Sequence, residues 1–132
     1  YMVHSEMCED WGYDRLHEAV EGRAMDEMKH AEQLIGRIIF LEGRPLVSSL
    51  KAIHIGAEVE KQISNDWDAE AGAVKAYNAG IALAVEVGDN GTRELLESIL
   101  KDEEEHIDWL ESQQDQIAQI GIQLYRSEQT KE

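Results

Sequence analysis

Apolar residues recur every three or four positions along three long stretches of the chain, which is the spacing of one face of an α-helix. The stretches run from about Asp14 to Leu41, from about Glu58 to Val87 and from about Thr92 to Ile120. The single proline, Pro45, lies outside all three. Because proline breaks helices and none interrupts these stretches, we expect three long helices that each turn one apolar face toward a shared core.

Residues that favour turns and helix ends divide the chain between these stretches. Gly88 to Gly91 are expected to form a turn, with Thr92 as the N-cap of the next helix. Gly121 is expected to end that helix, because glycine adopts the conformation of a helix C-terminus at little cost. A short terminal helix is predicted within Ile122 to Thr130. We expect Tyr1 to Asp10 to be the last turns of a fourth helix, most of which lies outside this sequence.

The connector from Glu42 to Ala57 is long enough to return along a helix. About 15 residues of extended chain span roughly 50 Å, whereas a helix of about 30 residues is roughly 45 Å long. The first two long helices can therefore be parallel neighbours joined by a crossover. This arrangement is typical of an all-α, ferritin-like four-helix bundle, here completed by a short C-terminal fifth helix.

Composition narrows the class of protein. The chain has 132 residues, 42% hydrophobic and only 6% aromatic, so a single domain, residues 1–132, with an aliphatic core is expected. With 12 basic and 28 acidic residues the net charge is −16, which argues against a nucleic-acid partner and favours cations. No apolar run is long enough to predict a membrane span. A lone cysteine, Cys8, favours a reducing, cytoplasmic compartment and a small apolar role for its thiol.

Acidic residues and histidines interrupt the apolar stripes near their midpoints. Glu27 and His30 lie three residues apart on the first stripe, Glu103 and His106 repeat this spacing on the third, and Glu70 lies in the middle of the second. Residues three apart project from the same helical face, so each Glu-x-x-His pair can bind one metal centre. Carboxylate oxygen with imidazole nitrogen suits iron, manganese or zinc better than calcium.

Other roles remain open for these residues. The alternative for the three glutamates is an ordinary buried ion pair, although the stripes offer few Lys or Arg at that level. The alternative for His30 and His106 is a core histidine held by hydrogen bonds. The remaining histidines, which are His4, His17 and His54, have no glutamate three positions earlier and are expected at the surface or at an interface.

Two further residues have competing roles. Tyr77 lies two turns from Glu70 on the same face, where core packing is favoured over a hydrogen bond to a ligand carboxylate. Met28 follows Glu27 by one position, which turns it about 100° away from the metal-binding face. With Met25 it forms a lateral apolar patch, for which spacing alone favours a flexible interface residue over a haem ligand.

The local sequence around these positions closely resembles the bacterioferritin family of ferritin-like di-iron proteins. The resemblance covers essentially the whole chain and rests on these motifs: Asp26-Glu27-Met28-Lys29-His30-Ala31, Phe40-Leu41-Glu42-Gly43 with Pro45, Asp102-Glu103-Glu104, and His106-Ile107-Asp108-Trp109-Leu110. It implies a subunit that binds two iron ions, oxidises Fe²⁺ with O₂ or H₂O₂, and stores the ferric product as a mineral.

The resemblance also implies a role for each ligand. In that family two glutamates bridge the irons, which implies this role for Glu27 and Glu103. The same resemblance makes His30, His106 and Glu70 terminal ligands. A sixth ligand is a glutamate about seven residues before the start of this sequence, in the part of the first helix that the sequence lacks. If that helix is truly absent from the protein, we expect oxidation to be slower.

Cofactor and assembly follow from the same resemblance. In the family a methionine at the position of Met28, one from each of two subunits, ligates a haem b on the dimer axis. A homo-oligomeric cage of about 24 subunits built from dimers is implied, together with an electron-donor protein for iron release. A rubrerythrin-like di-iron peroxidase and a non-catalytic helical haem carrier remain as alternatives. The chain has no Cys-x-x-Cys pair of the kind the peroxidase uses.

Overall fold

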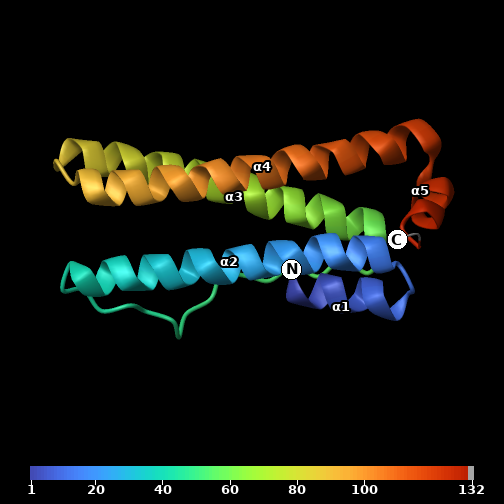
Figure 1. Cartoon of the computed structure of the whole chain (residues 1–132), viewed down its shortest axis with the longest axis horizontal. Coiled ribbons are helices and arrows are strands. Elements are labelled where there is room, and N and C mark those ends of the chain that lie inside the picture. The colour runs from blue at the N-terminus through green and yellow to red at the C-terminus, as the bar shows by residue number, and fades with distance from the viewer. Residues whose placement is uncertain (131–132) are drawn as a thin grey trace.

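The computed structural model describes residues 1–130, which fold into five α-helices joined by turns and one long connector (Figure 1). The helices are α1 (Met2–Asp10), α2 (Asp14–Phe40), α3 (Val59–Glu86), α4 (Asn90–Ile120) and α5 (Ile122–Glu128). The all-α fold is confirmed, and the described residues contain no strand. None of these helices combines the length and apolar composition needed to cross a membrane.

The two helices on either side of the connector point the same way (Figure 1). Residues 41–58 return along α2, so that α2 and α3 run parallel, as the connector length predicts. α3 and α4 form an antiparallel pair joined by a tight turn, and α1 packs against the first part of α2. This is the crossover topology of a ferritin-like bundle.

The turn before α4 starts the helix earlier than predicted. Asp89, and not Thr92, is the N-cap, because its carboxylate accepts a hydrogen bond from the Thr92 backbone N–H at 3.1 Å. Arg37, near the end of α2, donates to the same carboxylate at 2.9 Å and to the Thr92 hydroxyl at 3.0 Å. The cap prediction was wrong because an aspartate three residues before an orphan N–H, supported by an arginine, is the better acceptor.

A cluster of buried apolar residues lies where α5 closes one end of the bundle. Its buried apolar residues are Cys8, Leu16, Val20, Val59, Ile63, Leu110 and Tyr125. The Tyr125 hydroxyl donates to Gln113 Oε1 at 2.7 Å, so α5 docks through a buried ring with a satisfied polar group. Cys8 is a free and fully buried thiol, which agrees with the small apolar role predicted for it.

The C-terminal half of α2 leaves its apolar stripe largely uncovered. Ile38 is 39% exposed and Leu41 is 51% exposed, so the expectation that the stripe is buried along its whole length is wrong here. The connector beside this half is itself open, with Leu46 and Leu50 more exposed still. One chain therefore presents a considerable apolar surface outside its own core.

His4 is buried within the chain, which corrects the prediction that it lies at the surface or at an interface. Its Nδ1 lies 2.9 Å from Asp66 Oδ1 on α3, and its Nε2 accepts a hydrogen bond from the Gly56 N–H at 3.0 Å. A Cβ at Gly56 would stand 2.4 Å from the Gln62 backbone nitrogen, so the connector can approach α3 this closely only with a glycine. His4 and Gly56 together fix the end of the connector against α1 and α3, whereas His54 is exposed.

Candidate metal centre

The five predicted ligand residues meet near the middles of three helices. Glu27 and His30 belong to α2, Glu70 to α3, and Glu103 and His106 to α4. One ligand atom each from Glu27, Glu70, Glu103 and His106 lies within 4.8 Å of the others. His30 joins the cluster through Nδ1, which lies 2.9 Å from Glu103 Oε1. The structure thus brings all five side chains to one level of the bundle.

The cluster is withdrawn from solvent and from basic side chains. Glu70, Glu103 and His106 are at most 2% exposed, His30 is almost as deeply buried, and Glu27 is half-buried. Within residues 1–130, every ion pair made by an arginine involves a carboxylate outside the cluster. The ordinary buried ion pair with Lys or Arg is therefore not how these glutamates are accommodated.

Four buried atoms of the cluster have no hydrogen-bond partner, namely Glu27 Oε1, His30 Nδ1, Glu70 Oε2 and Glu103 Oε1. The short distance between His30 and Glu103 lacks the alignment of a hydrogen bond. A buried polar atom without a partner costs roughly 1–3 kcal/mol, so four together call for a compensating group. Carboxylate oxygen and imidazole nitrogen are good ligands for transition-metal ions, and the residues present fit such a group.

Protons are unevenly shared among the side chains of the cluster. Burial and the neighbouring carboxylates of Glu70 and Glu27 raise the pKa of Glu103 to about 11. Burial lowers the pKa of His106, but the neighbouring carboxylates of Glu27 and Glu70 outweigh it and raise that pKa to about 9. The neighbouring His106 and Glu103 side chains keep the pKa of Glu27 and of Glu70 below the usual range despite burial. Metal binding would therefore displace protons from Glu103 and His106.

Each histidine of the cluster turns its second ring nitrogen to an aspartate. His30 Nε2 lies 2.8 Å from Asp102 Oδ2, and His106 Nε2 lies 3.2 Å from Asp26 Oδ2. An aspartate that accepts the Nε2 proton leaves the Nδ1 lone pair free for a metal. Sequence reasoning did not assign this role to Asp26 and Asp102. The signal that could have found them is the repeated Asp-Glu-x-x-His pattern, whose aspartates serve the opposite helix.

Two tyrosines approach the carboxylates. The Tyr1 hydroxyl donates a hydrogen bond to Glu70, a contact without a sequence signal. Burial and the Glu70 charge raise the pKa of Tyr1 far above its ordinary value, so the hydroxyl stays protonated. Burial and the Glu103 charge raise the pKa of Tyr77 to about 12. The Tyr77 hydroxyl makes no hydrogen bond within residues 1–130, which fits a packing role for that ring.

Met28 lies on another face of α2, away from the cluster. Its side chain is 60% exposed, and that of Met25, one turn earlier, is 45% exposed. The lateral position follows from the helical rotation of about 100° per residue. Its thioether sulfur is thus accessible to a ligand or to a second chain.

A four-helix bundle with a buried cluster of carboxylates and histidines is typical of ferritin-like proteins. The comparison with known families supports the same class. The family model of the ferritin-like domain matches residues 1–120, so the chain belongs to the ferritin-like family. Its curated relatives include the "Bacterioferritin" of Brucella melitensis, 37% identical over 125 residues, and that of Mycobacterium leprae, 36% identical over 128 residues. The "Bacterial ferritin" of Synechocystis is 37% identical over 130 residues.

These alignments extend over nearly all of the chain. They cover 95%, 97% and 98% of it, and 78%, 80% and 83% of the respective relatives. The resemblance to bacterioferritins that the motifs indicated is thereby confirmed.

Proposed function

We propose that this ferritin-like protein stores iron and that it oxidises Fe²⁺ to Fe³⁺ at a di-iron centre within each chain. The observation that carries the proposal is the group between α2, α3 and α4 in which one ligand atom each of Glu27, Glu70, Glu103 and His106 lies within 4.8 Å of the others, while buried oxygens of its three glutamates have no hydrogen-bond partner. Membership of the family supports iron storage, and the oxygen and nitrogen donors suit a redox-active metal. Relatives named as bacterioferritins favour neither the rubrerythrin-like peroxidase nor the haem carrier.

The distances support bridging roles for two glutamates. Glu103 Oε1 lies 2.9 Å from His30 Nδ1 and 3.9 Å from His106 Nδ1. Glu27 also lies between the rings, with Oε2 3.7 Å from His30 Nδ1 and Oε1 3.4 Å from His106 Nδ1. Glu70 Oε1 lies 3.3 Å from His106 Nδ1, which favours a terminal role on that side. The imidazole centroids are 6.4 Å apart, so each histidine can serve a different ion.

The chain's own residues hold the ions and manage protons. When bound, two ferrous ions supply two electrons to O₂ or H₂O₂. Glu103 and His106 give up protons as the ions enter, which converts them from hydrogen-bond donors into ligands. Asp26 and Asp102 keep the two imidazole rings in the tautomer that ligates through Nδ1.

We extend the proposal to self-association and haem binding. One lateral face of α2 presents four exposed apolar side chains, namely Met25, Met28, Ile35 and Ile39. Exposed apolar surface of this extent favours burial against another chain. A second copy of the same face would bring two Met28 thioethers together, as a haem b shared between subunits requires. Dimers of this kind would build a cage of about 24 subunits.

Aerobic iron loading tests the proposed function. Fe²⁺ is added in small portions under air, and the protein is then separated by size and analysed for iron. A storage cage elutes as a large particle that carries many ferric ions per chain. A particle of dimer size that oxidises Fe²⁺ without retaining the product would instead indicate an oxidase or peroxidase. Neither oxidation nor retention would indicate a carrier and would overturn the proposal.

A further inference from the structure

A second group of potential metal ligands lies outside the candidate metal centre. Glu6 on α1 and His17 and Glu21 on α2 each offer one ligand atom, and these three atoms lie within 4.8 Å of one another. None of the three belongs to the cluster around Glu103. They are brought together because α1 packs along the first part of α2.

The tautomer of His17 is set by a neighbour that is not itself a candidate ligand. Its Nδ1 lies 2.8 Å from the Ser5 carbonyl oxygen, so Nδ1 must carry a proton and donate it. The Nε2 atom then faces Glu21 Oε2 at 3.3 Å. Metal-ligating histidines commonly donate one ring N–H to a backbone carbonyl and bind the metal through the other ring nitrogen. His17 has this arrangement, because Nδ1 donates to Ser5 and Nε2 is left as the possible ligand atom.

Neither carboxylate of the group has a basic partner. Within residues 1–130, Glu6 and Glu21 form no ion pair with Lys or Arg, and Glu21 pairs only with His17. The hydrogen bond to Ser5 raises the pKa of His17, and the charges of Glu9, Glu21 and Glu6 add to this effect. The group therefore concentrates negative charge around one imidazole nitrogen, where either a proton or a metal cation can be bound.

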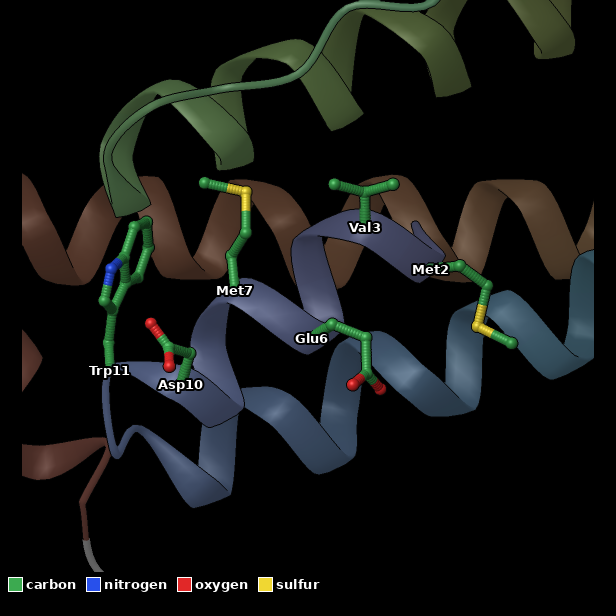
Figure 2. Close-up of a pocket in the computed structure, with 6 residues that line it drawn as sticks. All are labelled: Met2, Val3, Glu6, Met7, Asp10 and Trp11. Carbon is green, nitrogen blue, oxygen red and sulfur yellow. The ribbon is translucent and has the colours of Figure 1, made fainter.

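The carboxylate of Glu6 is open to an arriving ion. Glu6 is exposed, while His17 and Glu21 are half-buried. Figure 2 shows Glu6 on the side of a shallow groove along α1, with its carboxylate projecting past the helix beside α2. The same groove is lined by Asp10 at its other end and by apolar side chains that include Met2, Val3 and Met7.

We propose that Glu6, His17 and Glu21 form a mononuclear site for a divalent transition-metal cation such as Zn²⁺ or Co²⁺. One imidazole nitrogen and two carboxylate oxygens make a mixed donor set that suits these ions better than Ca²⁺ or Mg²⁺. Water completes the coordination on the exposed side. The site is independent of the proposed di-iron centre, because it shares no ligand with it.

Zinc titration of the intact protein by calorimetry tests the proposal. Glu6→Gln removes one ligand but leaves the His17 to Ser5 hydrogen bond in place. Glu18→Gln is the matched control, because it removes the same charge from an exposed residue beside His17 that is outside the group. We expect Glu6→Gln to bind one Zn²⁺ fewer per chain than the unmodified protein and Glu18→Gln to bind the same number. Equal numbers for all three proteins would overturn the site.

Crystals soaked in Co²⁺ give a second result that needs no variant. An anomalous difference peak about 2.1 Å from His17 Nε2 is expected if the cation is bound there. Loss of that peak in His17→Gln, with the peaks at the Glu103 cluster retained, would show that the two sites are separate. No anomalous signal at His17 in the unmodified protein would contradict the proposal.

Discussion

At the scale of single residues, Glu103 shows what a buried carboxylate requires. It is 1% exposed and faces Glu27 and Glu70 across a few ångströms. Three carboxylates this close cannot all ionise without a compensating charge. The proton held by Glu103, or the cation that we propose in its place, therefore reduces the repulsion among the three carboxylates. When no cation is bound, the remaining repulsion lowers the stability of the fold.

The pH dependence of Glu103→Gln tests this conclusion. A pKa raised from 4.5 to about 11 means that the folded chain holds a proton that the unfolded chain releases, so stability falls as pH rises through that interval. Gln does not titrate, and we expect the chelator-treated variant to melt at the same temperature as the unmodified protein or higher, with an advantage that grows with pH. Thermal unfolding followed by circular dichroism, at several pH values above 4.5, measures this. A variant that melts lower throughout would show that Glu103 is ionised in the fold.

Met28→Leu tests the second residue-scale role. Leucine preserves volume and apolar character but lacks the sulfur that would bind iron. We expect haem absorption to be lost after reconstitution, while Fe²⁺ oxidation stays within about twofold, because Met28 points away from the cluster. Met25→Leu, one turn earlier, is the matched control and should keep its haem. Haem retained in Met28→Leu refutes the assignment.

Residue-scale predictions from sequence succeeded where the signal was local. The Glu-x-x-His spacing places two side chains on one helical face, so the sequence alone was enough to group Glu103 with His106. The role of Tyr1 could not be predicted, because its contact crosses between helices and depends on how one helix is rotated against another, whereas Asp102 had a signal in the repeated Asp-Glu-x-x-His pattern. His4 was misplaced for the same reason, since its partners lie far away in the sequence.

At the scale of elements, the apolar periodicity predicted where the long helices lie. The residues that favour turns and caps predicted the start of α4 less accurately. α2 and α3 begin and end within one residue of the predicted limits. The N-cap of α4 lies three residues earlier than predicted because Asp89 caps the helix with help from Arg37, and a cap that depends on a distant arginine has no local signature. The connector length predicted the crossover, but not the point at which the connector docks.

Gly56→Ala tests that docking point. The new methyl group would collide with the backbone of Lys61 and Gln62 at the start of α3, which cannot move without disturbing the helix. We expect a loss of roughly 1–3 kcal/mol in the free energy of unfolding. Gly72→Ala, in the open middle of α3, is the control and should add roughly 0.5–1 kcal/mol, because alanine favours a helix more than glycine does. Urea unfolding measures both, and an unchanged Gly56→Ala protein would show that the connector is not anchored there.

At the scale of the whole molecule, the chain combines a large negative charge with an exposed apolar face on α2. A net charge of −16 predicted a cation-binding protein, and three of the carboxylates responsible lie in a cluster that is proposed to bind iron. The lateral patch of Met25 and Met28 was predicted as an interface. The exposure of the apolar stripe in the C-terminal half of α2 was not predictable, because periodicity shows that a face is apolar without showing which chain covers it. The same periodicity that built the bundle therefore also left a surface suited to a second copy.

The central claim is that Glu27, His30, Glu70, Glu103 and His106 hold two ferrous ions and oxidise them together. The most direct measurement mixes the protein, loaded with increasing Fe²⁺ under nitrogen, with oxygenated buffer in a stopped-flow spectrometer. We expect a rapid ferric absorbance phase whose amplitude stops rising at two Fe²⁺ per chain, and a rate at least about tenfold lower in Glu103→Gln. A rapid phase that shows no break at two, or that is unchanged in the variant, would contradict it.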